Sequence, residues 1–214
     1  MKTRSVLPHD AVIPVAELPL ETLLEQARAC TLCADALPLG PRPVLSAGAS
    51  ARILVVGQAP GTRVHETGIP WNDRSGERLR AWLGVDRDTF YDPDRFAILP
   101  MGLCYPGRGR SGDLPPRPEC APRWHPPVLA ALPRIRLRLL IGHYAQRHYL
   151  EDARGTLSDR VAAWRALLPG TFLLPHPSPR NQRWLRDRPW FEAEVVPALR
   201  SRVQEALLEE VQDK

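Results

Sequence analysis

Lysine is almost absent from this chain of 214 residues and occurs only as Lys2 and Lys214. Arginine therefore supplies 27 of the 29 positive charges, and the formal net charge at pH 7 is +5. The guanidinium fork suits phosphates and base edges. A GC-rich genome, which favours arginine codons, explains the same composition equally well. The charge is therefore compatible with a nucleic-acid partner but is not evidence for one by itself.

Long apolar runs are also missing, because no stretch approaches the roughly 20 residues that a membrane-spanning helix needs. The opening residues are interrupted by Pro8 and Pro14, a pattern unlike that of a signal peptide. We therefore expect a cytoplasmic protein that does not contact a membrane. The length and a hydrophobic content of 43% fit one domain over residues 1–214. Within it we expect residues 1–15 to be flexible and the loop 105–118 to be mobile.

Cysteine is scarce, and its placement favours a metal centre over disulfides. Cys30 and Cys33 form a C-x-x-C pair, while Cys104 and Cys120 stand on later loops. Disulfides are disfavoured in a reducing cytoplasm, and four thiolates suit either zinc or a 4Fe–4S cluster. Two alternatives stay open. The first is a redox C-x-x-C pair that leaves the other two cysteines without a role, and the second is four unrelated buried cysteines.

Short apolar runs alternate with segments of helical spacing along the chain. The strand-like runs lie at 52–56, 96–100, 137–141 and 172–175. The helical patterns lie at 18–29, 75–83, 143–150, 156–168 and 191–211, and Ser75 is the expected N-cap of the second. This alternation predicts an α/β fold of three layers, α/β/α, with a central, mainly parallel four-stranded sheet.

A glycine-rich loop follows the first predicted strand. It has the sequence GQAPG at residues 57–61, and GIPWNDRSG follows at residues 68–76. Glycine lets backbone amides approach a ligand, and Ser75 opens a helix whose N-terminus favours phosphate. Trp71 is available to stack on a planar ring, with a packed core aromatic as the alternative.

A second polar loop, HPSPRN at residues 176–181, follows the apolar run at 171–175. Its two prolines stiffen the backbone, and its other side chains offer hydrogen bonds to an anion. Ligands of open α/β sheets bind outside the carboxyl ends of the strands. His176 and its neighbours are therefore candidates to hold an anionic leaving group beside a phosphate. The alternative is a proline-rich loop whose histidine is only structural.

In their order and spacing, these motifs resemble the uracil-DNA glycosylase superfamily. The four cysteines resemble the iron–sulfur branch of that superfamily, the type first associated with thermophiles, and the resemblance spans about residues 18–181. It implies a 4Fe–4S cluster on Cys30, Cys33, Cys104 and Cys120, with zinc as the alternative. It also implies DNA containing a damaged base as the partner, and we expect the protein to act as a monomer.

The resemblance implies a repair reaction in which a flipped nucleotide loses its base by hydrolysis of the N-glycosidic bond. Uracil is the expected base, and hypoxanthine is an alternative. Trp71, where family members usually carry Phe, would stack on the base, and His176 would donate a hydrogen bond to its developing oxyanion. The other expected contacts come from Gly57, Gln58 and Ala59 to the base or water, from Ser75 and Ser178 to phosphates, and from Arg180 to the gap in the duplex. Asn181 is a further expected substrate-binding residue. Arg108 and Arg110 are expected to follow the DNA backbone, with a solvated basic loop as the alternative.

The chain departs from the superfamily pattern where a carboxylate is usual, at the second or third position of the first motif. Those positions hold Gln58 and Ala59. We therefore expect His65 or Asp73 to serve the attacking water, because histidine accepts a proton near neutral pH. The stretch 99–102 also lacks the amide with which many relatives read uracil, and Asn72 is the expected substitute.

The missing carboxylate leaves other functions open. A protein of the same fold could bind damaged or single-stranded DNA without catalysis, and a zinc-stabilised α/β hydrolase of nucleotides is a third reading. Covalent crosslinking to DNA is not expected, because the chain has no Arg-Arg-Ile-His stretch.

Overall fold

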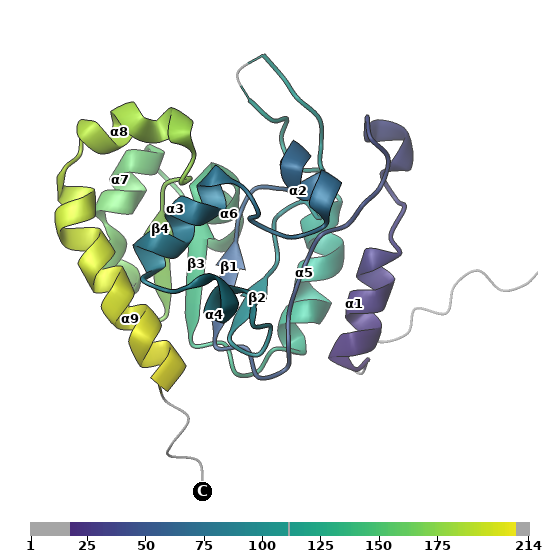
Figure 1. Cartoon of the computed structure of the whole chain (residues 1–214), viewed down its shortest axis with the longest axis horizontal. Helices are drawn as coiled ribbons and strands as arrows, with labels where there is room; N and C mark the ends of the chain where they lie inside the picture. Colours follow the sequence, from purple (N-terminus) through teal and green to yellow (C-terminus); the bar gives the residue numbers. More distant parts are fainter. Residues whose placement is uncertain (1–17, 111, 209–214) are drawn as a thin grey trace, which may run out of the picture.

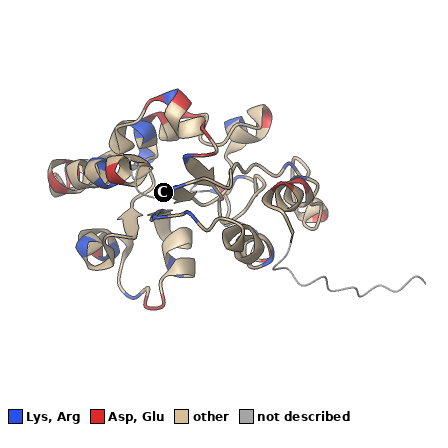
Figure 2. Ribbon diagram, turned by 90° about the horizontal axis from the view of Figure 1, so that it is seen from below, with Lys and Arg blue, Asp and Glu red and all other residues tan. Residues whose placement is uncertain are grey.

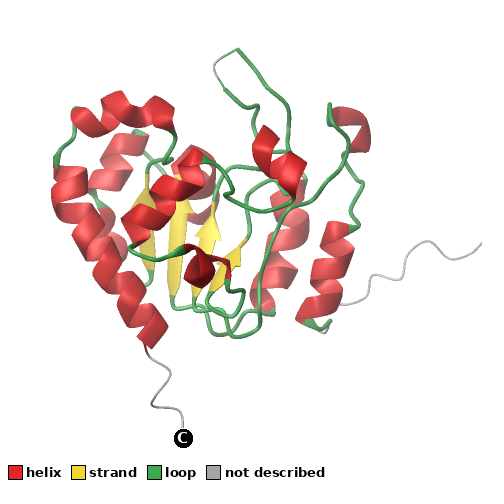
Figure 3. Ribbon diagram, in the orientation of Figure 1, coloured by secondary structure: helices red, strands yellow, loops and turns green. Residues whose placement is uncertain are grey.

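The computed structural model describes residues 18–110 and 112–208, so the segment 1–15 lies outside the described residues. At its centre is a sheet of four strands in the order β2-β1-β3-β4 (Figure 3). The strands are β1 (Ile53–Val56), β2 (Phe96–Ile98), β3 (Leu137–Ile141) and β4 (Thr171–Leu174). Every neighbouring pair is parallel, which confirms the predicted sheet.

Alternate strand residues face opposite sides of the sheet and build two separate cores. Ile53 and Val55 belong to one core, and Leu54 and Val56 belong to the other. The first core is covered by α3 (Arg74–Leu83), α4 (Arg87–Tyr91), α7 (Leu157–Ala162), α8 (Gln182–Arg186) and α9 (Val196–Leu208). The second is covered by α1 (Leu20–Arg28), α5 (Cys120–Ala130) and α6 (Gly142–Tyr149). These helices form the outer layers of the three-layer α/β/α fold (Figure 1), and burial on both faces explains the continuous apolar strands.

The start of α3 differs from the prediction. Asp73, and not Ser75, is its N-cap, and the Asp73 Oδ1 accepts a 2.8 Å hydrogen bond from the Gly76 backbone N–H. Aspartate caps helices as well as serine does, and its charge also suits the positive end of the helix dipole. Ser75 is instead buried inside the first turn.

Two longer predicted helices are subdivided in the structure. The pattern at 156–168 is α7 followed by a tighter 3-10 turn, Trp164–Leu167, which places the Trp164 ring on Phe172 with centroids 5.0 Å apart. The pattern at 191–211 opens with a π-helical turn, Phe191–Val195, before α9 begins. Its last three residues lie outside the described residues.

The sequence patterns did not predict several of the helices. One is α2 (Thr62–Thr67), and another is α5, which contains Pro126 and Pro127. Proline inside a helix removes a hydrogen bond and usually breaks it. Here Trp124 and Val128 are almost completely buried against the sheet, so tertiary packing outweighs the local preference.

The loop that we expected to be mobile, 105–118, forms a short hairpin. Its backbone contacts include Gly109 N–H to the Gly112 oxygen at 2.7 Å and Leu114 N–H to the Gly107 oxygen at 2.8 Å. Arg108 and Asp113 face each other in an isolated antiparallel bridge. The hairpin projects from the upper edge of the sheet in Figure 1, the edge where the parallel strands end. No helix among residues 18–110 and 112–208 is long and apolar enough to cross a membrane.

Candidate active site

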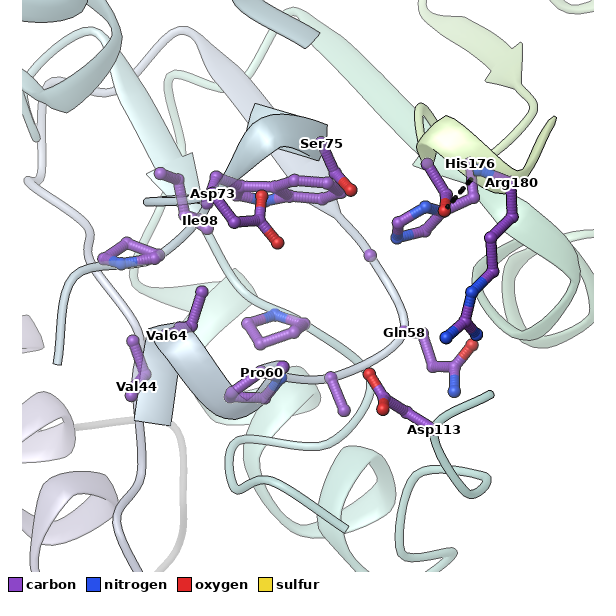
Figure 4. Close-up of a pocket in the computed structure, with 17 residues that line it drawn as sticks. Val44, Gln58, Pro60, Val64, Asp73, Ser75, Ile98, Asp113, His176 and Arg180 are labelled. Carbon is purple, nitrogen blue, oxygen red and sulfur yellow. Dashed lines mark hydrogen bonds between the residues drawn. The ribbon is translucent and has the colours of Figure 1, made fainter. Parts of the chain in front are cut away.

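A pocket of about 240 Å³ opens at the carboxyl ends of the strands (Figure 4). One liquid water takes up about 30 Å³, so the pocket has room for a flat heterocycle. Segments that are distant in sequence form its walls. They contribute Val44, residues 57–61 after β1, Val64 of α2, Pro70, Trp71, Asp73 and Ser75 before and within α3, Ile98 and Pro100 at β2, Asp113 from the hairpin, and His176, Ser178 and Arg180 after β4. Both polar loops predicted from the sequence therefore meet here.

Trp71 forms one wall of the pocket and has a strained backbone. Its φ of 55° lies in the left-handed region that bulky residues rarely adopt. Two glycines make room for it. A Cβ on Gly76 would lie 1.7 Å from the Trp71 carbonyl oxygen, and a Cβ on Gly57 would lie 2.7 Å from the indole Cζ2. Strain of this kind costs about 1–3 kcal/mol and gathers at functional sites.

His176 forms the adjacent wall, with its ring centroid 5.5 Å from that of Trp71 and the two planes tilted by 31°. Burial lowers the pKa of His176, and the charge of Asp73 acts in the opposite direction. Burial is the larger of the two effects, so the pKa of His176 lies below its ordinary value and the imidazole is neutral at pH 7. A neutral imidazole has one N–H to donate, so His176 can stabilise a negative charge that develops on a ligand oxygen.

The model of the uracil DNA glycosylase superfamily matches residues 45–200 of this chain, which include every residue that lines the pocket except Val44. The chain belongs to the uracil-DNA glycosylase superfamily. In this superfamily member the pocket lies where open α/β sheets hold their ligands. The matched residues include Cys104 and Cys120 but not Cys30 and Cys33.

Other sequence-predicted residues of this superfamily member also reach the pocket. Gln58 does so, and its Nε2 donates a 2.9 Å hydrogen bond to the Leu114 carbonyl in the hairpin. Ser178 lines the pocket, and its Oγ accepts a 3.2 Å hydrogen bond from the Arg180 N–H. Gly57, Ala59, Asp73, Ser75 and Arg180 are the remaining predicted residues in the walls.

His65 does not line the pocket. Its neighbour on α2, Val64, does so, and consecutive helix residues point about 100° apart. The His65 ring lies 6.2 Å from Tyr105, and its Nδ1 is buried without a hydrogen-bond partner in the described part of the chain. The structure therefore does not place this histidine where it could serve the attacking water.

Asn72 also lies outside the pocket and lines a neighbouring cleft instead. Its Oδ1 accepts two 3.3 Å hydrogen bonds from the Arg87 guanidinium. Asn181 is not part of the pocket wall either, and its role is to hold the loop. Its Nδ2 donates a 2.7 Å hydrogen bond to the His176 carbonyl oxygen.

Asp113 is a charged pocket residue that the sequence did not indicate. No motif surrounds it, and only the fold of the hairpin brings its carboxylate to the pocket of this superfamily member. Partial burial raises its pKa, while the charges of Arg180 and Arg108 lower it. No local sequence pattern marks a loop aspartate of this kind. Predicting its place in the pocket would have required knowledge of a contact between distant segments.

An arginine-rich cleft adjoins the pocket and shares Asp73 and Ser75 with it. Its basic residues are Arg63, Arg74, Arg80 and Arg87. Figure 2, seen from the end opposite the pocket, shows basic and acidic segments interspersed over the ribbon. In the cleft beside the pocket, these four arginines outnumber the two acidic residues, Asp73 and Glu77.

The four cysteines line one small second pocket, between the loop after α1, the loop after β2 and the start of α5. All four are free thiols. The Sγ of Cys120 accepts a 3.3 Å hydrogen bond from the Leu103 N–H, and burial raises its pKa to about 12. Within the described ranges, no group of three or more His, Cys, Asp or Glu side chains is placed so that it could hold a metal ion. The donor set is that of a four-cysteine centre, but the geometry is not that of a ligated one.

Proposed function

We propose that this protein is a DNA glycosylase that hydrolyses the N-glycosidic bond of a deaminated base, uracil first among them, after the nucleotide is flipped from DNA. The observation that carries the proposal is the pairing of Trp71 and His176 on adjacent walls of a pocket of the right size at the carboxyl ends of the strands. The superfamily match over residues 45–200 supports the reaction class.

The chemistry follows from this arrangement. The base lies against the Trp71 indole, and its carbonyl oxygen accepts a hydrogen bond from neutral His176. As the C1′–N bond lengthens, the base takes up negative charge, and that hydrogen bond becomes stronger. A preorganised donor of this type contributes about 10²–10³ in rate.

DNA is held by charge outside the pocket. The arginine-rich cleft lies next to the first turn of α3, where the helix dipole also favours phosphate. Arg180 at the mouth of the pocket and Arg108, which pairs with Asp113 in the hairpin, add positive charge there, and Arg110 belongs to the same hairpin. Phosphate contacts of this kind provide most of the affinity and make it depend on salt.

We also propose a 4Fe–4S cluster on Cys30, Cys33, Cys104 and Cys120, with zinc as the alternative. The support is that these thiols, 90 residues apart at the extremes, surround one pocket. When bound, the cluster supplies a crosslink between the loop after α1 and the segments that flank the hairpin. No step of base excision passes through it.

The test is an excision assay with iron-reconstituted protein on oligonucleotides that carry uracil, hypoxanthine or xanthine, as single strands and as duplexes. We expect abasic product from a uracil strand and a loss of about 10²–10³-fold in His176→Ala. Intact strands for every lesion would contradict the proposal, and so would equal rates in His176→Ala.

A second function is favoured by one observation, the absence of a carboxylate from residues 57–61. In that case the protein binds damaged DNA without cutting the glycosidic bond. A gel-shift experiment on the same oligonucleotides separates the two, because tight binding without abasic product is expected only of the binder.

A further inference from the structure

Hydrolysis of a glycosidic bond needs a group that takes a proton from the attacking water, and this inference rests on the proposed glycosylase function. The described walls of the pocket contain two carboxylates, Asp73 and Asp113. Carboxylates near the reacting carbon also stabilise the positive charge of an oxocarbenium-like sugar. The question is which of the two is available to water.

Asp73 already has a structural task. Its Oδ1 accepts the hydrogen bond from Gly76 that caps α3, and its charge lies at the positive end of that helix. Taking up a proton would weaken both interactions. Asp73 therefore suits a fixed negative charge near His176 better than a proton acceptor.

Asp113 has no such task. No hydrogen bond to its carboxylate is found within residues 18–110 and 112–208, and the side chain is exposed to solvent at the pocket mouth. Its Oδ2 lies 3.6 Å from the position that a Cβ on Gly61 would occupy. In Figure 4 it lies beside Gln58 and Arg180, across the pocket from Asp73 and Ser75.

Gln58 holds the hairpin that carries this carboxylate. Its Nε2 donates to the carbonyl of Leu114, the residue after Asp113. The hairpin is also packed closely further on, because a Cβ on Gly102 would lie 2.9 Å from the Pro116 Cβ. An amide is suited to this position, since a carboxylate at residue 58 would repel both the Leu114 oxygen and the Asp113 side chain.

We propose that Asp113 is the general base of the reaction and that Gln58 is the residue that positions it. The C1′–N bond breaks with its electron pair on the base, whose oxygen is hydrogen-bonded to His176. The water oxygen forms a bond to C1′, and one water proton passes to the Asp113 carboxylate. That proton then leaves to solvent, and the base anion takes a proton from solvent, so that one water is consumed.

The charged groups that face Asp113 are compatible with this role. Partial burial and the charge of Asp73 raise its pKa, and Arg180 and Arg108 lower it. General bases work best when their pKa approaches the working pH, and filling the pocket with a nucleotide increases the burial. The excision rate should therefore fall at acid pH as the carboxylate of Asp113 takes up a proton.

The first experiment measures single-turnover excision by the full-length protein. Asp113→Asn should lose about 10²–10⁴ in rate and also lose the acid limb of the pH profile, while Asp113→Glu recovers part of the rate. Binding to a strand with a 2′-fluorinated, hydrolysis-resistant nucleotide should not change. Asp88→Asn, which removes an exposed carboxylate on α4, is the control and should match the wild type.

The second experiment tests Gln58. Gln58→Ala and Gln58→Glu should both slow excision, because each releases the Leu114 carbonyl. If Gln58 had no role of its own and only replaced the carboxylate that is usual in this motif, Gln58→Glu would instead speed the reaction. That result would overturn the positioning role.

The outcomes distinguish this inference from the function on which it rests. Wild-type rates in Asp113→Asn, with slow excision in His176→Ala, would refute the role of Asp113 and leave the glycosylase function standing. No excision by the wild type from any oligonucleotide would overturn both.

Discussion

The side-chain amide of Asn181 donates a 2.7 Å hydrogen bond to the carbonyl oxygen of His176. The bond closes the loop after β4 on itself, because the two residues are five apart. Together with the Ser178 cap and two prolines, it fixes the direction in which the His176 ring enters the pocket. A residue outside the pocket thereby controls the geometry of one inside it.

Asn181→Ala should therefore slow excision without weakening DNA binding. One hydrogen bond is worth about 0.5–1.5 kcal/mol, so a loss of up to about tenfold in the single-turnover rate is expected. Asn181→Asp keeps the size of the side chain but cannot donate, and it should behave in the same way. A wild-type rate in Asn181→Asp would show that the hydrogen bond is not the cause.

Gly76→Ala should damage both stability and activity. The added Cβ would lie 1.7 Å from the Trp71 oxygen, so the strained Trp71 turn must move. Overpacking of this kind costs about 1–3 kcal/mol or more, and urea unfolding measures it. Gly170→Ala is the matched control, because a Cβ there meets nothing within 4 Å. Equal stability of the two variants would contradict the close approach of Trp71.

Acid should destabilise the fold through His125. Its Nε2 lies 3.0 Å from the Pro100 carbonyl, which can only accept, so Nε2 carries the proton and Nδ1 accepts from the Tyr149 hydroxyl at 2.5 Å. Burial lowers the pKa of His125 from 6.5 to about 4. As pH falls from 6.5 to 4, the unfolded chain therefore binds a proton that the folded protein does not. Stability is lost in that window, by about 3 kcal/mol at most.

The measurement is the free energy of unfolding at several pH values between 7 and 4. In His125→Gln, an amide can replace both hydrogen bonds without titrating. The wild type should lose more stability than the variant as pH falls, so the difference between their free energies of unfolding should shrink or change sign. A constant difference across the range would show that His125 does not carry the acid sensitivity.

Arg74→Gln should weaken DNA binding equally for damaged and undamaged strands. Arg74 is exposed in the cleft beside the pocket, and each phosphate contact contributes about one unit to the slope of log affinity against log salt. Arg134→Gln is the control, since this exposed arginine precedes β3, at the edge of the sheet opposite the pocket. An unchanged salt slope in Arg74→Gln would remove this cleft from the DNA-binding surface.

Protein purified without oxygen should be brown and contain iron, and Cys→Ser changes at the four positions should each reduce the iron content. Serine keeps the size of cysteine but is a poor ligand for an iron–sulfur cluster, which is held by thiolates. Colourless protein that contains zinc would contradict the cluster and show that the four cysteines bind zinc.

Local patterns predicted the sheet and the two polar loops well. The strands are short apolar runs between helical segments, and a parallel strand buried on both faces has that composition wherever it occurs. The loops of His176 and Trp71 follow two of these strands, so the topology alone brings them to one edge. The same reasoning failed for Ser75 and His65, because the exact start of α3 and the rotation of α2 are set by single contacts.

The sequence by itself determined the layers of the fold, the edge of the sheet that carries the site, and the pairing of an aromatic ring with a histidine there. The tertiary structure alone decided that a second carboxylate, that of Asp113, reaches the pocket besides Asp73. Asp113 arrives through the bond between Gln58 and Leu114, two residues 56 positions apart. Such a contact has no signature in either segment, because its energy exists only when both have already folded into place.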